Sequence, residues 1–380
     1  MNRSYLVGFV TLFLITSAHS VAADWDQAHN DISAFLGVQS NNNLFNTAIQ
    51  RQSEQSGTAG MRWDWLGLFE GYGLQLPLQI TRQQYRQTSD LAQTLYQLQP
   101  ELRLFLTPQT DLSLQATLRK DQHLAGDSAA EFLTPAEQAL IAKQSGAKAA
   151  LSFGQAPDTQ NLRIILGTDR RQQDVQQLRY STLDSDFAEA QYSHKLNENV
   201  ALVVDIARRQ EQQNQTSTDL NQYGGGLAVQ WTGQQFFHLT AGRFSRSSPA
   251  GQLAKITGSY WQLDNVWQFD QRWQLQLQSG RNSVLSYATA SVSQLDTRHA
   301  ASVRWQYDQS HQFSAELSQL TSRLDQGDYR RTRSALGAGW RWQWAQQWQS
   351  LVQLSQVHQR QQQQPDRNRL ELMAEVSWSW

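Results

Sequence analysis

The C-terminal stretch Leu370-Glu371-Leu372-Met373-Ala374-Glu375-Val376-Ser377-Trp378-Ser379-Trp380 alternates apolar and polar side chains. In an extended chain, the apolar residues from Leu370 to Trp380 would share one side, and the opposite side would be mostly polar. A period of two predicts a β-strand with one apolar face. The stretch is as long as a tilted membrane-spanning strand of roughly 9–11 residues. It ends on an aromatic residue, where a water-soluble sheet seldom leaves an exposed tryptophan. We therefore expect a strand that crosses a membrane.

This stretch resembles the C-terminal insertion signal of Gram-negative outer-membrane β-barrels, in which alternate apolar residues lead to a terminal aromatic residue. The resemblance implies a location in the outer membrane of a Gram-negative bacterium. It also implies contact with outer-membrane lipid and recognition by the barrel-assembly machinery through Leu370–Trp380.

The N-terminus has the pattern of a secretory signal peptide. Asn2 and Arg3 precede an apolar run from Tyr5 to Thr16, and the small residues Ser20-Val21-Ala22-Ala23 follow. Such a run is shorter than a spanning helix, although an N-terminal membrane anchor is the alternative. The sequence predicts that residues 1–23 are removed and that residues 24–380 form a single barrel.

The composition excludes several classes of function. The chain has no cysteine, which rules out disulfides and thiolate chemistry, and a net charge of -1, which gives no basic field for nucleic acid. Its mean hydropathy of -0.60 is compatible with a barrel, because only alternate residues of a barrel strand face lipid. Its 14 tryptophans argue against disorder.

Alternating segments recur along the whole chain in pairs joined by short turns. After a first strand at Asp31–Ser40, the predicted hairpins are Ala59–Trp65 with Leu74–Ile80, Leu102–Leu106 with Leu112–Leu118, Ala149–Phe153 with Leu162–Leu166, Phe187–Lys195 with Val200–Ile206, Leu227–Trp231 with Phe237–Ala241, Trp261–Phe269 with Trp273–Leu277, Ala301–Tyr307 with Phe313–Leu317, and Leu336–Trp344 with Trp348–Leu354. With the final strand they predict an all-β, antiparallel up-and-down transmembrane barrel of about 18 strands, with 16 as the alternative. Pro77 is a weak point, because proline cannot donate to a ladder.

One long connection, residues 121–146, interrupts the pattern. Thr134-Pro135-Ala136-Glu137 has the form of a helix start, with proline at the first helical position. We expect an outer loop that carries a small helix, either folded into the lumen as a constriction or lying outside it.

Aromatic residues gather where the strands meet the short turns: Trp231, Phe269, Trp273, Tyr307, Trp344, Trp348, Trp378 and Trp380. Amphipathic rings are favoured at a membrane interface, so this set predicts one aromatic girdle.

If the apolar residues face lipid, the alternate residues face the lumen. The candidate lumen-lining residues are Arg62, Asp64, Arg103, Arg119, Arg163, Asp205, Arg209, Asp264, Arg298, Arg304, Glu316, Arg341, Glu371 and Glu375, together with Lys148. They either pair across neighbouring strands and brace the wall, or line a hydrated conduit whose selectivity they set.

No pattern for catalysis or for a metal or cofactor site is present. His238, His299 and His358 lie on different predicted strands with no recognisable motif around them, and HExxH, GxSxG and phosphate-loop patterns are absent. We expect neither an enzyme nor a cofactor. Gly224-Gly225-Gly226 lies within a strand, where it would permit curvature or a close approach.

The segment Phe35-Leu36-Gly37-Val38-Gln39-Ser40-Asn41-Asn42-Asn43-Leu44-Phe45 is similar to the first strand of the β-barrel porin-2 group, which ends in an Asp/Asn-rich turn and an apolar pair. Members are often encoded with exopolysaccharide or capsule machinery. The resemblance implies a passive conduit for export of a surface polysaccharide, working with periplasmic export components. The alternatives are a general or solute-specific diffusion porin, and a structural or adhesive barrel without transport.

Overall fold

The computed structural model describes residues 25, 27–44, 52–124, 139–154, 160–175, 178–213, 216–231, 234–248, 255–285, 293–324, 330–362 and 364–380. Their strands are β1 His29–Asn41, β2 Glu54–Phe69, β3 Tyr72–Tyr85, β4 Gln93–Leu98, β5 Glu101–Thr107, β6 Thr110–Leu124, β7 Ala139–Phe153, β8 Gln160–Val175, β9 Leu178–Lys195, β10 Val200–Gln213, β11 Thr216–Trp231, β12 Gln235–Ser247, β13 Ile256–Gln268, β14 Trp273–Leu285, β15 Ser293–Gln306, β16 His311–Leu324, β17 Arg330–Gln343, β18 Trp348–Gln361 and β19 Gln364–Ser379. The one helical turn among them is η1, Ser89–Leu91.

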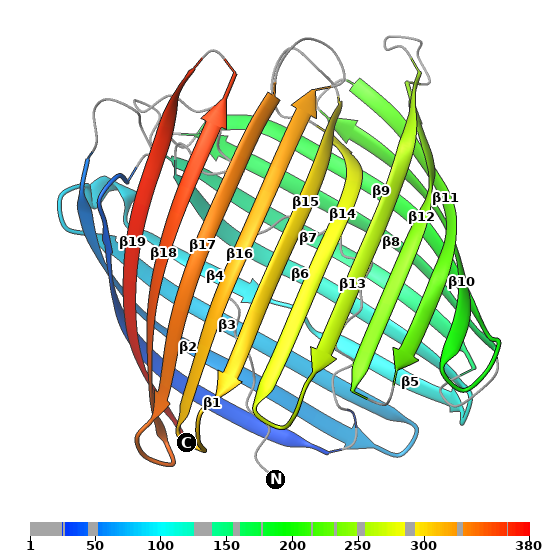
Figure 1. The fold of residues 1–380 in the computed structure, drawn as a ribbon, viewed down its shortest axis with the longest axis horizontal. Coiled ribbons are helices and arrows are strands. Elements are labelled where there is room, and N and C mark those ends of the chain that lie inside the picture. The colour runs from blue at the N-terminus through cyan, green and yellow to red at the C-terminus, as the bar shows by residue number, and fades with distance from the viewer. Residues whose placement is uncertain are drawn as a thin grey trace.

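The strands form one closed antiparallel sheet (Figure 1). Apart from β4 and β5, neighbours along the chain pair with each other, and β19 pairs with β1 over Ser33 to Asn41 to complete the ring. The short segments β4 and β5 both lie between β3 and β6 and occupy one strand position. The prediction of an 18-stranded transmembrane-type barrel is thus confirmed.

Two prolines explain why β4 and β5 are separate. Pro77 of β3 accepts a hydrogen bond from the amide of Gln99, and Pro100 follows directly. Neither proline has an N–H to donate, so the ladder is interrupted here although β4 and β5 keep the same register to β3. The predicted weak point at Pro77 is therefore a local break within an otherwise continuous sheet.

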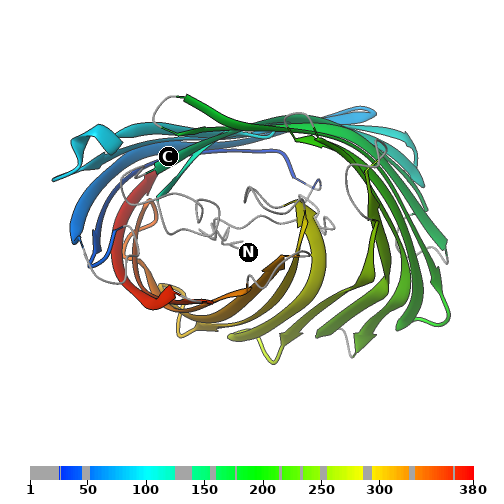
Figure 2. The ribbon, with the colours of Figure 1, turned by 90° about the horizontal axis from the view of Figure 1, so that it is seen from above.

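Alternation along each strand separates an outer from an inner face. On β1 the outer residues Leu36 and Val38 are 69% and 64% exposed, whereas the inner residue Phe35 is 3% exposed. The same contrast holds on β10, where Leu202, Val204 and Ile206 are exposed. Seen from above, the barrel is an oval ring with a long, flat wall on one side (Figure 2).

The long connection is shorter than the sequence predicts. Asp121–Leu124 belongs to β6 and Ala139–Gly146 to β7, and the two segments pair residue by residue. The expected loop boundaries at 121 and 146 are therefore wrong, and so is the helix where it would include residues 139–143. Alternating contacts with the neighbouring strand stabilise the extended form. Residues 125–138, and the predicted signal peptide at 1–23, lie outside the described residues.

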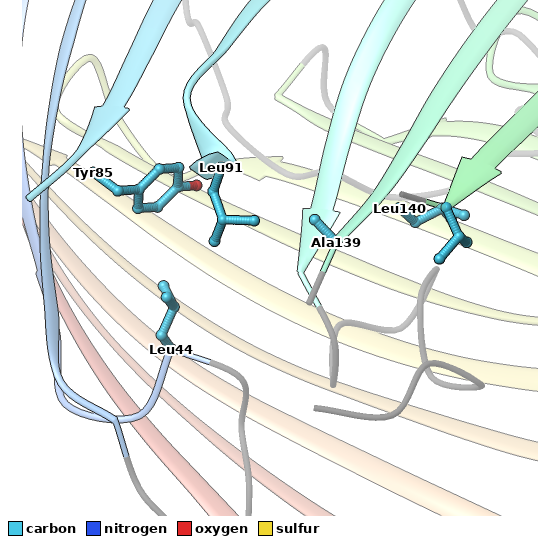
Figure 3. Close-up of a cluster of buried hydrophobic side chains, with 6 residues drawn as sticks. Leu44, Tyr85, Leu91, Ala139 and Leu140 are labelled. Carbon is cyan, nitrogen blue, oxygen red and sulfur yellow. The ribbon is translucent and has the colours of Figure 1, made fainter. Parts of the chain in front are cut away.

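A small apolar cluster lies at the long-loop end of the flat wall (Figure 3). Tyr85 of β3 and Leu140 of β7 pack there with Leu44, with Leu91 of η1 and with Val175 of β8. Glu54 lies at the same end and accepts hydrogen bonds from the backbone amides of Arg86, Gln87 and Thr88. Together these contacts fix the η1 turn against the barrel wall.

The opposite end of the barrel carries a nearly continuous row of exposed aromatic rings. Successive rings lie 4.5 to 6.4 Å apart in one run: Trp273, Trp305, Phe313, Trp340, Trp342, Trp344, Trp348, Trp378 and Trp380. The step from Phe313 to Trp340 is slightly longer, at 6.5 Å. Such a row suits the headgroup level of a bilayer.

The short turns at this end share a capping arrangement. The Asp308 carboxylate accepts the backbone N–H groups of Ser310 and His311, and the Asp270 carboxylate does the same for Arg272 and Trp273. Asn197 caps its turn through the amides of Asn199 and Val200. Side-chain acceptors at the first turn position thus close three of the periplasmic-type hairpins.

Candidate channel lining

All fourteen candidate lumen-lining residues lie on the strand face opposite the exposed apolar side chains. Arg62 and Asp64 alternate with the outer residues Met61, Trp63 and Trp65 on β2, and Arg304 alternates with Val303 and Trp305 on β15. The same phase holds for Arg103, Arg119, Arg163, Asp205, Arg209, Asp264, Arg298, Glu316, Arg341, Glu371 and Glu375. The inner face is therefore strongly charged, with both signs present.

Many of these charges form ion pairs across the wall. Arg62 lies 2.9 Å from Glu375, and Arg103 lies 2.9 Å from Asp111. Additional pairs are Arg119 with Asp121, Arg209 with Glu189 at 3.6 Å, and Arg369 with Glu371 at 3.9 Å. The pairs of Arg103 with Asp111 and of Arg209 with Glu189 join neighbouring strands, and the pair of Arg62 with Glu375 spans β1. The pairs of Arg119 with Asp121 and of Arg369 with Glu371 each lie within a single strand.

The partners were not singled out from the sequence. Asp111 and Asp121 fall just outside the predicted strands, and Arg369 lies just before the final stretch. Glu189 does lie within the predicted segment Phe187–Lys195, between Ala188 and Ala190, so alternation alone would have found it.

One group of arginines lies close together near the short-turn end. Arg341 of β17 experiences repulsion from Arg304 of β15 and from Arg62 of β2, and attraction from Glu375. Arg62 already pairs with Glu375. Arg304 has no ion pair or hydrogen bond to any other described residue. We call Arg304, Arg341 and Arg62 the basic track, since it carries more positive than negative charge.

A second group lies on the flat wall. Glu101 of β5 is attracted to Lys148 of β7 and to Arg163 of β8, and Lys148 and Arg163 repel each other. Neither cation forms an ion pair within hydrogen-bonding distance of another described residue. This side of the inner face therefore also presents positive charge.

The acidic residues elsewhere on the inner face are held by neutral donors. Asp264 accepts hydrogen bonds from the Gln262 and Gln278 amides at 2.8 and 3.1 Å. Asp205 accepts one from the Tyr260 hydroxyl. Neutral donors bring no positive charge to a carboxyl group, so the hydrogen bonds to these two acids differ in kind from the ion pairs above.

The glycine triplet provides a close approach, one of the two roles expected of it. A Cβ on Gly224 would lie 2.2 Å from the Tyr260 hydroxyl oxygen, and one on Gly242 would lie 2.7 Å from the Tyr260 ring. The ring thus lies over two glycines, and this position brings its hydroxyl to Asp205.

The three histidines belong to different environments. His238 is buried on the inner face and stacks on Phe236, whereas His299 contacts Ser279 on the outer face. His358 contacts Asn368 and lies near Asp366. In the part of the chain that the structure describes, no group of three or more His, Asp or Glu side chains is placed to hold a metal ion.

Comparisons with solved structures show the same architecture in outer-membrane proteins. The outer membrane protein OpdK of Pseudomonas aeruginosa has a TM-score of 0.52 at 10% identity, covering 93% of this chain and 99% of that one. OccAB4 of Acinetobacter baumannii has a TM-score of 0.50 at 10% identity, covering 94% and 100%. OccK2 (OpdF) of P. aeruginosa, solved in complex with glucuronate, has a TM-score of 0.53 at 11% identity, covering 93% and 98%.

No family model matches the chain. No curated protein matches it either. At identities near one residue in ten, the structural likeness establishes the fold. The closed sheet, the apolar outer face and the aromatic row at one end, together with this shared architecture, show an outer-membrane β-barrel of a Gram-negative bacterium.

Proposed function

We propose that the protein is a diffusion channel of the outer membrane that admits small polar solutes and favours those with a carboxylate. The observation that carries the proposal is the basic track on the inner face of a closed barrel. Arg304 has no described partner to neutralise it, and Arg341 lies within electrostatic range of it. Guanidinium groups bind carboxylates with well-matched geometry.

The neighbours support this function more than polysaccharide export. The OccK2 structure contains glucuronate, and an OpdK structure contains vanillate; both ligands are small carboxylates. The export hypothesis rests on the segment Phe35–Phe45, whose residues through Asn41 form an ordinary barrel strand and whose last residue lies outside the described part. A diffusion channel is therefore the better-supported of the alternatives.

The rate of solute passage would depend on where charged side chains lie along the inner face. A partly dehydrated carboxylate would gain from the field of two arginines on the inner face. The paired charges elsewhere, such as Arg103 with Asp111, hold the wall rigid and add little net field. We further propose that the barrel-assembly machinery recognises Leu370–Trp380, which forms the strand that closes the ring.

Swelling of vesicles that contain the purified protein tests this function. We expect entry of glucose and faster entry of glucuronate, and a selective loss of the glucuronate advantage in R304Q/R341Q. The control R272Q removes a cation from an exposed turn outside the wall and should leave the preference unchanged. Absence of swelling with every solute would refute the proposal, and so would loss of surface polysaccharide on deletion of the gene with no change in solute entry.

A further inference from the structure

A cluster of cations lies on the outer face of the flat wall, where lipid rather than solute surrounds the barrel. Lys120 of β6 and Lys143 of β7 are direct cross-strand partners on that face. Arg82 of β3 is exposed and donates to Thr94 at 3.2 Å, and it repels Lys120, as does Lys143. Arg86 follows the end of β3, four residues past Arg82 on the same side, and donates a hydrogen bond to the Gln55 side chain at 3.0 Å. We call these four residues the outer basic cluster.

The negative groups nearby do not cancel this charge. Asp174 of β8 pairs with Lys143 at 2.9 Å. Among the described residues, Lys120 donates a hydrogen bond to the neutral Gln93 side chain at 3.0 Å, and Arg82 donates one to the Thr94 hydroxyl; neither pairs with an acid there. Next along the wall, Arg170 is neutralised by Asp184. A net positive charge therefore remains on this part of the wall. Lys120 and Lys143 lie directly opposite each other, and like charges in such positions destabilise a sheet.

The cluster lies immediately beyond the apolar band, toward the long-loop end. Along β6 the outer residues are Leu114, Ala116 and Leu118, and the next outer residue is Lys120. Leu114 and Leu118 are 41% and 47% exposed. The C-terminus lies at the opposite end of the barrel (Figure 1), and so does the aromatic row. We therefore place these cations at the headgroup level of the outer leaflet.

A groove on the same strands begins four residues from the lysine pair, toward the short-turn end of the barrel. It has a volume of about 520 Å³ and an almost wholly apolar wall. Ala116 and Ala147 are cross-strand partners in it, and Ala149 adjoins them, so three small side chains form its floor. Leu74 and Leu102 flank it beside Pro100, at the break between β4 and β5. The groove opens toward the hydrocarbon, because its apolar side chains, from Leu74 to Leu166, belong to the outer face; the inner-face residues Gln115, Lys148 and Gly167 adjoin it from behind.

We propose that the outer basic cluster and this groove form one binding site for a phosphorylated, acylated lipid of the outer leaflet. Lys120, Lys143 and Arg82 would bind the phosphate, since cations at a membrane surface pair strongly with anionic headgroups. An acyl chain would fill the hollow above Ala116 and Ala147. A phosphate between Lys120 and Lys143 also accounts for two like charges in direct opposition. The charge favours this occupant over a second barrel, whose identical wall would be repelled.

The test is native mass spectrometry of the full-length protein reconstituted with bis-phosphorylated lipid A, with dephosphorylated lipid A or with phosphatidylcholine. Wild-type protein should retain lipid A in preference to the other two. In R82Q/K120Q/K143Q the occupancy should fall at least about tenfold, because each cation near the surface contributes roughly a fivefold factor. The matched control R208Q/R243Q/R323Q removes three outer-face cations from β10, β12 and β16 and should bind as wild type does.

A second variant tests the groove separately. A147L fills the hollow but keeps every charge, and it should lower the retention of lipid A without changing the response to phosphate removal. Far-UV circular dichroism verifies that each variant folds. Equal retention of phosphorylated and dephosphorylated lipid would overturn the site, as would wild-type retention by R82Q/K120Q/K143Q, or a dimer held by this wall in place of lipid.

Discussion

Arg62 and Glu375 form an ion pair of 2.9 Å across the seam where the first and last strands close the barrel. Strand β1 lies between them, and its Phe35 ring lies 4.1 Å beneath the Arg62 guanidinium. Because Glu375 is only 8% exposed, this contact joins β2 to β19 in a partly dry environment. It connects residues that are 313 positions apart and fixes the register of closure.

Loss of either partner should weaken closure. We expect R62Q and E375Q each to lower the free energy of unfolding by about 1–3 kcal/mol, between the values for exposed and buried pairs. The charge swap R62E/E375R should recover part of this loss. Urea unfolding in lipid vesicles, followed by tryptophan fluorescence, gives the coupling energy. A coupling energy near zero would mean that the pair contributes nothing to closure.

The buried pair of Arg246 with Glu211 should contribute more to the stability of the fold than the pair of Arg62 with Glu375. Arg246 is 2% exposed and also contacts Thr218 and Ser283, so it links β10, β11, β12 and the end of β14. E211Q leaves a buried cation without its counter-charge, and we expect it to lower the free energy of unfolding by about 3–5 kcal/mol. Hydrogen exchange should rise at the long-loop ends of these strands. The control D184N removes an exposed pair with Arg170 and should lower the free energy of unfolding far less; equal effects would contradict this account.

The position of Tyr260 depends on glycine beneath it. In G224A the new methyl group would lie 2.2 Å from the Tyr260 oxygen and 2.7 Å from the Ala241 carbonyl, so the ring must move away from Asp205. We expect a loss of about 1–3 kcal/mol, typical of overpacking. G57A, where the Cβ meets open space, is the matched control and should be nearly neutral. The urea midpoints of the two variants decide the point, and similar midpoints would rule out a role for the close approach.

The Asp308 turn should make the stability of the short-turn end depend on pH. The backbone N–H group of Ser310, and next that of His311, lower the pKa of the Asp308 carboxyl. A carboxyl group whose pKa is lower in the folded state stabilises that state at pH values above its pKa in the unfolded chain, about 3.9. This contribution is lost as the pH falls through the pKa of the folded state. The urea midpoint of wild-type protein should therefore fall more between pH 6 and pH 3 than that of D308N. An identical fall in both proteins would show that the turn does not contribute.

Alternation was sufficient to predict the strands and their faces. The stretch Leu370–Trp380 and the paired segments before it each coincide with an observed strand, because a side-chain period of two fixes which residues share a face. Four of them end one residue beyond the strand, at Phe269, Tyr307, Trp344 and Trp380. The same rule placed all the candidate lumen residues on one face. Strand ends were less predictable, since β6 continues past the apolar band with the polar residues Arg119 to His123, where propensity carries little signal.

The pairing of charges could not be predicted from the sequence. Whether Arg62 meets Glu375 or another acid depends on the register of three strands and on ring closure, which are collective properties of the sheet. The segment β4 was also missed. Gln93–Leu98 carries polar residues on both faces, so it lacks a clear period of two, and Pro100 follows it. Likewise the unneutralised state of Arg304 is visible only when every neighbouring strand is in place.

Single-channel recording in a planar bilayer under a potassium chloride gradient tests the proposed channel most directly. We expect a steady conductance and a reversal potential that favours chloride, because the basic track lies within the conduction path. In R304Q/R341Q the reversal potential should shift toward zero, whereas R272Q should match wild-type protein. A barrel that stays silent, or a reversal potential that is the same in R304Q/R341Q and in wild type, would contradict the assignment of an anion-favouring diffusion channel.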